Sequence, residues 1–152
     1  MPQNEIVKIK IITVGGTIDK IYFDAKSAYE VGPPNISAVL ADLSLNIDYS
    51  VQSLMQKDSL EMDDEDRRII VDCVRETEEK RIIITHGTDT MVETARTLAA
   101  VVDKTIVLTG ALQPALFKTS DAMFNIGCAI AAVQTMQANV YIAMNGQIFT
   151  HD

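Results

Sequence analysis

The fold of this chain follows from one stretch, Val14-Gly15-Gly16-Thr17-Ile18-Asp19-Lys20, which ends an apolar, β-branched run from Ile6 to Val14. Such a run predicts a buried β-strand. Two glycines then allow a sharp turn with no side chains in the way, and Thr17 follows at the strand exit. In open α/β sheets, ligands bind outside the carboxyl ends of the strands. This exit is therefore a candidate ligand site, and a plain strand-to-loop turn is the alternative.

Four further strands alternate with helical segments. We expect strands at Tyr49–Met55, Arg81–Thr85, Thr105–Thr109 and Val140–Met144. Apolar spacing predicts helices over Asn35–Leu43, after the acidic run Asp63–Asp66, from Met91 to Val101, and from about Ser120 to Met136. This alternation implies a mostly parallel sheet of about five strands with helices on both faces, a Rossmann or flavodoxin-like α/β fold. The segment between Thr17 and Pro34 is expected to be a long functional or mobile loop.

Length and composition limit the possible partners. The 152 residues fit one domain, and 47% apolar with 22% charged residues indicates a soluble globular chain. The net charge of −8 and the lack of a basic stripe argue against nucleic-acid binding. No apolar stretch approaches the roughly 18 residues of a membrane span, and the N-terminus lacks a signal-peptide pattern. We therefore expect no membrane partner and a cytoplasmic location.

The cysteines and histidines predict neither disulfide nor metal. Cys73 and Cys128 lie in apolar helical contexts and are expected to be buried thiols in a reducing compartment. The two histidines, His86 and His151, lack metal-ligand spacing, so no metal or other cofactor is expected. Nucleotide binding at Gly15-Gly16 is also disfavoured, because the chain lacks the G-x-G-x-x-G and Walker spacings.

Small or polar residues follow the strands wherever the chain leaves the predicted sheet. These exits include Gly15-Gly16-Thr17, Asp58-Ser59, Gly87-Thr88-Asp89 and Gly110-Ala111. In a parallel sheet they converge on one edge, which is the physical argument for a site. Free amides at a helix start near Thr88-Asp89 would suit an oxyanion or a carboxylate.

Structural roles compete with these functional ones. Thr88, Asp89 and Thr90 could form a helix N-cap cluster, and a buried, hydrogen-bonded structural role is favoured for His86. Ser59 could equally cap the helix that begins near Asp63, and Tyr29 could be a solvent-facing loop aromatic.

Two motifs in series resemble the bacterial-type L-asparaginase family. They are Gly15-Gly16-Thr17-Ile18 and Thr85-His86-Gly87-Thr88-Asp89-Thr90-Met91, followed by Thr109-Gly110-Ala111-Leu112-Gln113-Pro114. The resemblance runs from Ile11 to about Gly146 and covers only the family's N-terminal domain, so residues 1–152 are expected to form that domain without the C-terminal one. The segments Gly16–Lys20 and Phe117–Asp121 also resemble the short-chain, single-domain asparaginases.

The resemblance implies hydrolysis of L-asparagine to L-aspartate and ammonia, with no cofactor. Thr17 matches the nucleophile, and Tyr29 matches the lid tyrosine that helps to activate it. Thr88 matches the second catalytic threonine, which orients the attacking water, and Asp89 matches the acid that holds the α-ammonium. The implied substrate-binding set comprises Gly16, Ser59, Gly87, Asp89 and Ala111, with Ser59 on the α-carboxylate and the Ala111 carbonyl accepting from the leaving amide. The amides of Thr17 and Thr88 would form the oxyanion hole.

Two positions depart from the family pattern. Leu60 follows Ser59 where most members carry a polar residue. The catalytic lysine of the family would fall a few residues beyond Asp152, and neither Lys20 nor Lys118 occupies its position. Without a nearby cation Thr88 lacks its expected activation. A catalytically weak amino-acid-binding or interaction domain is therefore an alternative, as is a broader amidase acting on glutamine.

The single-domain length also bears on assembly. Two-domain members of the family complete each site with residues from a neighbour's C-terminal domain. A chain without that domain would close its site with Tyr29 or with another copy of itself. The resemblance therefore implies a homo-oligomer, most simply a two-fold dimer.

Overall fold

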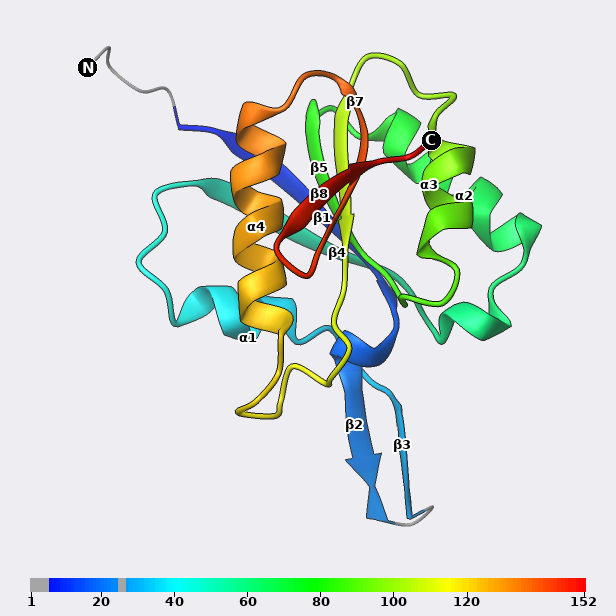
Figure 1. The fold of residues 1–152 in the computed structure, drawn as a ribbon, viewed down its shortest axis with the longest axis vertical. Helices are drawn as coiled ribbons and strands as arrows, with labels where there is room; N and C mark the ends of the chain where they lie inside the picture. Colours follow the sequence, from blue (N-terminus) through cyan, green and yellow to red (C-terminus); the bar gives the residue numbers. More distant parts are fainter. Residues whose placement is uncertain (1–5, 25–26) are drawn as a thin grey trace.

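The computed structural model describes residues 6–24 and 27–152 as an α/β domain built on a six-stranded sheet (Figure 1). The strand order is β4-β1-β5-β6-β7-β8. The first five strands in this order pair in parallel, and only β8 is antiparallel to its neighbour β7. The strands are β1 (Lys8–Gly15), β4 (Asp48–Lys57), β5 (Arg81–Thr85), β6 (Thr105–Thr109), β7 (Asn139–Met144) and β8 (Gln147–Thr150).

The order of the parallel strands creates a switch point between β1 and β5. The chain goes from β1 outward to β4 on one side, and then returns to β5 on the other side of β1. The connections after β1 and β5 therefore leave the sheet in opposite directions. In doubly wound folds of this order, ligands bind in the crevice that opens at that point. The exits of β1 and β5 are thus the first place to look for a site.

Helices cover both faces of the sheet, as the alternation of strands and helices predicts (Figure 1). α2 (Asp64–Glu76) and α3 (Met91–Leu98) pack on one face, where Ile12, Ile84 and Leu108 belong to the shared core. α1 (Ile36–Ala41) and α4 (Ala122–Thr135) pack on the other, over Ile11, Ile83 and Val107. Successive strand residues thus supply opposite cores, because side chains alternate across a strand. This is why the strands read as continuous apolar runs.

The expectation of a long loop from Thr17 to Pro34 is wrong. A short 3-10 helix, η1 (Thr17–Asp19), leads into an antiparallel hairpin of β2 (Lys20–Phe23) and β3 (Ala28–Val31), which projects from the lower end of the molecule in Figure 1. Tyr22 and Tyr29 are directly paired across the two strands, with ring centroids 5.2 Å apart. The two strands are too short for a periodic signal, and the pairing that stabilises them is visible only in the folded chain.

A sixth main-sheet strand, β8, was not among the expected five. It follows a tight turn at Asn145-Gly146, where both residues have positive φ, 55° and 80°. Asn-Gly is the preferred pair for a two-residue hairpin turn of this kind, so the sequence did carry a signal for this hairpin. All four residues of β8 are exposed, which explains why they lack the apolar run of the buried strands.

α2 begins where the acidic run predicts, and a capping box fixes its first turn. The Asp63 carboxylate accepts from the Asp66 amide, while the Asp66 carboxylate accepts from the Asp63 amide. Lys57, at the end of β4, pairs with Asp66 at 2.8 Å. This ion pair and the capping hydrogen bonds hold the pKa of Asp66 below its usual value. The β4–α2 connection is therefore held at both ends of η3 (Ser59–Glu61).

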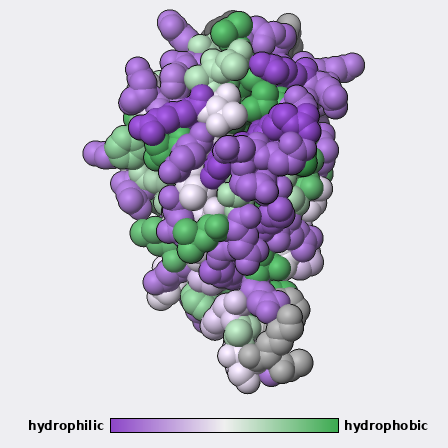
Figure 2. Space-filling view, turned by 90° about the vertical axis from the view of Figure 1, so that its right-hand side faces the viewer, coloured by the Kyte–Doolittle hydropathy of each residue, from purple (hydrophilic) through white to green (hydrophobic). Residues whose placement is uncertain are grey.

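The surface over α2 and α3 is mostly hydrophilic, and the molecule narrows toward the β2–β3 hairpin (Figure 2). Within the part of the chain that the structure describes, no helix is long and apolar enough to cross a membrane.

Candidate active site

The exits of β1 and β5 are pressed together at the switch point. A methyl group built on Gly16 would lie only 2.5 Å from the Gly87 amide nitrogen and 2.6 Å from the Gly87 Cα. Gly16 also has a φ of 93°, in the region that favours glycine. Only two glycines permit so close an approach. Thr17 and Thr88 each lie one Cα–Cα step, about 3.8 Å, beyond this contact, and both are partly exposed.

Ser59 joins the same contact from the exit of β4. A methyl group on Gly87 would lie 2.6 Å from Ser59 Cβ and 2.7 Å from its Oγ. Ser59 is 1% exposed, and its hydroxyl has no hydrogen-bond partner among the described residues. It does not cap α2, since Asp63 does so. A buried hydroxyl without a protein partner is costly, and such a group is available to bind a ligand.

Thr88 and Asp89 do not begin a helix, contrary to expectation. α3 starts at Met91, and its N-cap residue Thr90 makes no capping hydrogen bond. The Thr90 hydroxyl instead donates to the Ser59 carbonyl oxygen at 3.0 Å, so the N-cap alternative also fails for this side chain. Residues 87–90 form an irregular turn linked to η3. Asp89 is exposed at the tip of this turn.

His86 is a buried structural residue, as the sequence favours. Its Nδ1 lies 2.7 Å from the Gly87 carbonyl oxygen, which can only accept, so Nδ1 carries the proton. Its Nε2 lies 2.8 Å from the Thr94 hydroxyl, from which it accepts. Burial lowers the pKa of the ring to about 4. The neutral ring therefore fixes the Gly87–Thr88 peptide group through its carbonyl oxygen.

Ala111 lies in the loop after β6, which reaches the other strand exits. The Ala115 amide donates to the Ile18 carbonyl oxygen at 3.0 Å, so this loop is tied directly to η1. Ala111 is 1% exposed. Its carbonyl accepts no hydrogen bond from residues 6–24 or 27–152. It is thus a second buried acceptor that lacks a protein partner.

Tyr29 stands apart from this cluster, on the projecting hairpin. It is 47% exposed and packs edge-on against Phe117, with ring centroids 5.6 Å apart. It lines a cavity of about 350 Å³ together with Lys20 and Asp58, which form an ion pair at 3.4 Å. Its hydroxyl makes no hydrogen bond to another described residue. The shared cavity therefore places Tyr29 beside the β4 exit.

Asp19 is a residue that the sequence reading did not single out. It is 2% exposed, accepts from the Asn35 amide at 2.9 Å, and its carbonyl accepts from Gly32. Burial raises the pKa of its carboxyl to about 6, against the lowering effect of the Asn35 amide. Asp19 thus closes the base of the hairpin two residues after Thr17. Only its place two residues after the Gly-Gly-Thr stretch could have drawn attention to it.

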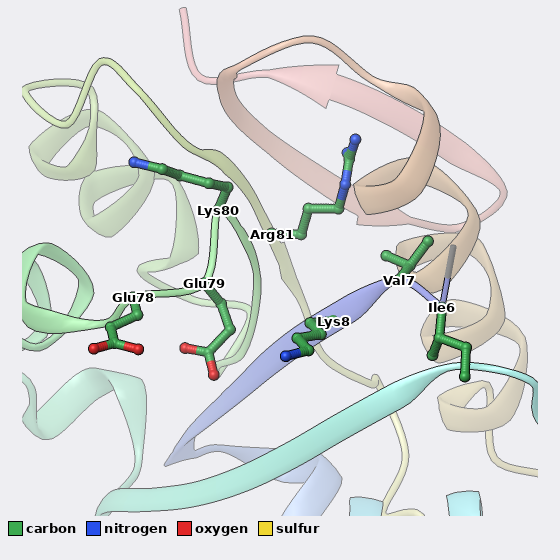
Figure 3. Close-up of a pocket in the computed structure, with 7 residues that line it drawn as sticks. All are labelled: Ile6, Val7, Lys8, Glu78, Glu79, Lys80 and Arg81. Atoms are coloured by element: carbon green, nitrogen blue, oxygen red, sulfur yellow. The ribbon is translucent and has the colours of Figure 1, made fainter. Parts of the chain in front are cut away.

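Two further hollows differ from this cluster. One, of about 540 Å³, lies at the amino ends of β1 and β5, away from the strand exits (Figure 3). Its Lys80 already pairs with Asp103, and its Arg81 donates to the Val133 carbonyl oxygen. The other, of about 440 Å³, is a largely apolar groove lined by Thr88, His151 and Asp152, among others. In the described chain no group of three His, Cys, Asp or Glu side chains could hold a metal ion.

Residues 8–151 match the family described as Asparaginase, N-terminal. The chain belongs to the asparaginase family. It is 28% identical over 160 residues to a glutaminase-asparaginase of Pseudomonas fluorescens biotype A, covering 96% of this chain and 44% of that protein. It is 29% identical over 154 residues to L-asparaginase 2 of Escherichia coli, covering 92% of this chain and 43% of that protein.

The fold is also that of solved asparaginases. The structure of L-asparaginase I from Vibrio cholerae superposes with a TM-score of 0.85 at 22% identity, over 97% of this chain and 47% of that one. This chain therefore spans less than half the length of these asparaginases. It corresponds to their N-terminal part.

The Gly16–Gly87 contact predicts the effect of one methyl group. Gly16→Ala forces a side chain against the Gly87 backbone at a strained φ, so we expect a loss of about 1–3 kcal/mol in the free energy of unfolding, measured with urea. The control is Gly127→Ala in α4, where an added methyl meets nothing within 4 Å; it should gain about 0.4–1 kcal/mol. Equal urea midpoints for Gly16→Ala and the unchanged chain would contradict the contact.

The shifted pKa values of His86 and Asp19 predict opposing pH dependences. Between pH 4 and 6.5 the unfolded chain protonates His86 and the folded chain does not, so the free energy of unfolding rises with pH. Between pH 3.8 and 6 the folded chain protonates Asp19 and the unfolded chain does not, so this group makes the free energy of unfolding fall as the pH rises. Asp19→Asn removes the falling contribution. We expect its stability to rise more steeply over this range than that of the unchanged chain or of the exposed-site control Asp42→Asn, and an unaltered slope would refute the Asp19 shift.

Proposed function

We propose that this domain carries the site for hydrolysis of the L-asparagine side-chain amide, giving L-aspartate and ammonia through a threonine acyl-enzyme. The observation that carries the proposal is the contact of Gly16 with Gly87, with the unpaired Ser59 hydroxyl packed against it. It brings Gly16, Gly87 and Ser59 together from the exits of β1, β5 and β4, with Thr17 and Thr88 next to the two glycines in the chain. The family membership supports the same reaction class.

The chemistry proceeds in two halves. The Thr17 hydroxyl attacks the amide carbon and forms an ester to the aspartyl group, while the C–N bond breaks and ammonia leaves with the proton of the hydroxyl. The amide groups of Thr17 and Thr88, on either side of the glycine contact, are the donors for the oxyanion. A water oriented by the Thr88 hydroxyl then attacks the ester, and Thr17 regains its proton as aspartate is released.

The amino-acid end of the substrate has its own partners in this proposal. The Ser59 hydroxyl donates to the α-carboxylate, which supplies the partner that the buried hydroxyl lacks. The exposed Asp89 carboxylate holds the α-ammonium. The Ala111 carbonyl accepts from the side-chain amide, so a second unpaired buried acceptor gains a donor. Leu60 is 74% exposed and contributes no polar group there.

Activation of the nucleophile is the least complete part of the site. Tyr29 is the proposed activating hydroxyl, carried by the hairpin that begins two residues after Ile18. Lys20 is paired with Asp58 and does not serve as the cation near Thr88. His151 and Asp152 line the same groove as Thr88. If a longer polypeptide carried a lysine a few residues after Asp152, the chain leading to that lysine would leave from the groove that Thr88 lines.

A wider amide specificity is the second candidate function. The relative from Pseudomonas fluorescens is described as a glutaminase-asparaginase. Glutamine carries the same amide one methylene further from the α-carbon, and one methylene in a pocket changes specificity by only about 1–3 kcal/mol. Comparing ammonia release from asparagine and glutamine at equal concentration distinguishes the two, since equal rates favour the broader amidase.

The nucleophile assignment is tested by Thr17→Val, which removes the hydroxyl and keeps the side-chain shape. We expect ammonia release from asparagine to fall by at least about a hundredfold, because the acyl-enzyme cannot form. The matched control is Thr97→Val on the exposed side of α3, which should leave the rate unchanged. An undiminished rate in Thr17→Val would rule out this nucleophile. No ammonia release from the unchanged chain, combined with thermal stabilisation by aspartate, would favour an amino-acid-binding domain instead.

We further propose that the chain forms a homo-oligomer, most simply a two-fold dimer. The exposed side of α4 supports this, because residues 122–135 include no charged residue, and Met123 and Phe124 are 55% and 60% exposed. On a chain of net charge −8, this face lets two copies meet without bringing like charges together. Sedimentation at micromolar concentration should give at least twice the 16.7 kDa of one chain, and Phe124→Glu should reduce it to one. A monomer in the unchanged chain would contradict the proposal.

A further inference from the structure

The loop after β6 is held from behind by one carboxylate. Asp121 accepts from the Leu112 amide at 3.0 Å and from the Gln113 amide at 3.1 Å. It also accepts from the Asn125 side-chain amide at 2.9 Å. Three donors on one carboxylate fix both its position and that of the loop backbone. This arrangement concerns Ala111, because the Leu112 amide belongs to the same peptide group as the Ala111 carbonyl.

The planarity of that peptide group determines where the carbonyl points. In a trans peptide the N–H and C=O bonds point in opposite directions. Asp121 binds the Leu112 N–H, so the Ala111 carbonyl must point away from Asp121. This carbonyl belongs to a residue that is 1% exposed and receives no donor from the described chain. Its free lone pairs are therefore held on the side of the loop opposite to Asp121.

The Asp121 carboxylate binds this loop and does not cap its own helix. It is the N-cap residue of α4, yet its side chain makes no capping hydrogen bond. The Ala122 amide at the helix start donates instead to the Ser120 hydroxyl at 3.0 Å. An aspartate at this position normally caps the helix amides. Its use on the preceding loop shows that capping is not what this carboxylate contributes.

Asn125 extends the support to the next strand. Its side-chain amide donates to the Gly110 carbonyl oxygen at 2.9 Å, and its Oδ1 accepts from the Asn145 amide at 3.3 Å. Asn125 is fully buried. The exits of β6 and β7 are thus joined through one side chain, so Gly110 and Ala111 cannot move independently of the sheet.

His86 provides the same kind of support on the opposite side of the site. Its ring binds the Gly87 carbonyl, so the Thr88 N–H of that peptide group points away from the ring. The proposed oxyanion donor and the proposed amide acceptor are therefore both backbone groups. Each is aimed by a side chain bound to the reverse end of its own peptide group.

We propose that Asp121 is a positioning residue that aims the Ala111 carbonyl at the side-chain amide of the substrate; this rests on the proposed function. The hydrogen bond formed there requires an N–H on the ligand. Asparagine has one at that position and aspartate does not. Loss of the Asp121 carboxylate should therefore weaken the binding of asparagine and leave the binding of aspartate nearly unaffected. A general structural defect would weaken the binding of both.

The test measures binding of both amino acids by calorimetry in the Thr17→Val chain, which cannot turn over asparagine. Adding Asp121→Asn should lower the asparagine affinity by about three- to tenfold, the value of one hydrogen bond, and change the aspartate affinity by less than about twofold. Equal losses for the two ligands overturn the positioning role. Failure of the Thr17→Val chain itself to bind either amino acid overturns the proposed function, and this inference with it.

Two further variants control for misfolding and for the change in charge. Asp121→Ser removes the carboxylate and keeps a small polar residue that is favoured at helix starts, so it should fold and show the same selective loss. Asp103→Asn makes the same charge change at an exposed site before β6 and should leave both affinities unchanged. A ligand-free readout is amide hydrogen exchange of Leu112, whose side chain is 60% exposed. Its amide should exchange slowly in the unchanged chain and faster in Asp121→Ser, and a fast-exchanging Leu112 amide in the unchanged chain overturns the proposal.

Discussion

The whole arrangement depends on the close approach of two backbones at Gly16 and Gly87. No side chain fits between them, since an added methyl would lie within 2.6 Å of the facing backbone. The contact is possible only because β1 and β5 are neighbours with their exits at the same edge. It brings the two Gly-Thr segments of the chain side by side, although they are about seventy residues apart in the sequence. Every further element of the candidate site is placed relative to this pair.

Two kinds of polar group bear on the candidate site. Supporting groups, such as His86 and Asp121, have all their partners within the protein and fix the peptide groups that they bind. Presenting groups, the Ser59 hydroxyl and the Ala111 carbonyl, are buried and have none in the described chain. Satisfied groups add rigidity, and a buried group without a partner costs free energy.

The projecting hairpin is linked to this site through Asp19. A buried carboxyl whose pKa is raised to about 6 lies at the hairpin base, directly after Thr17 and Ile18. The outer part of the hairpin rests on the loop after β6, through Tyr29 and Phe117. That loop is the one that Asp121 holds. The hairpin and the Ala111 carbonyl therefore share one support, and a change in either is expected to reach the other.

The sequence alone determined the five parallel strands of the sheet and their exits. The strands at residues 81–85 and 105–109 have the predicted bounds, because buried apolar runs and glycine exits are local signals. It also predicted the structural role of His86, and the Asn145-Gly146 turn was readable from its residue types. Only the tertiary structure decided the β2–β3 pairing, the start of α3 after Thr90, the burial of Ser59 and the partners of Asp121. These depend on contacts between distant segments, whose energies no local pattern of residues encodes.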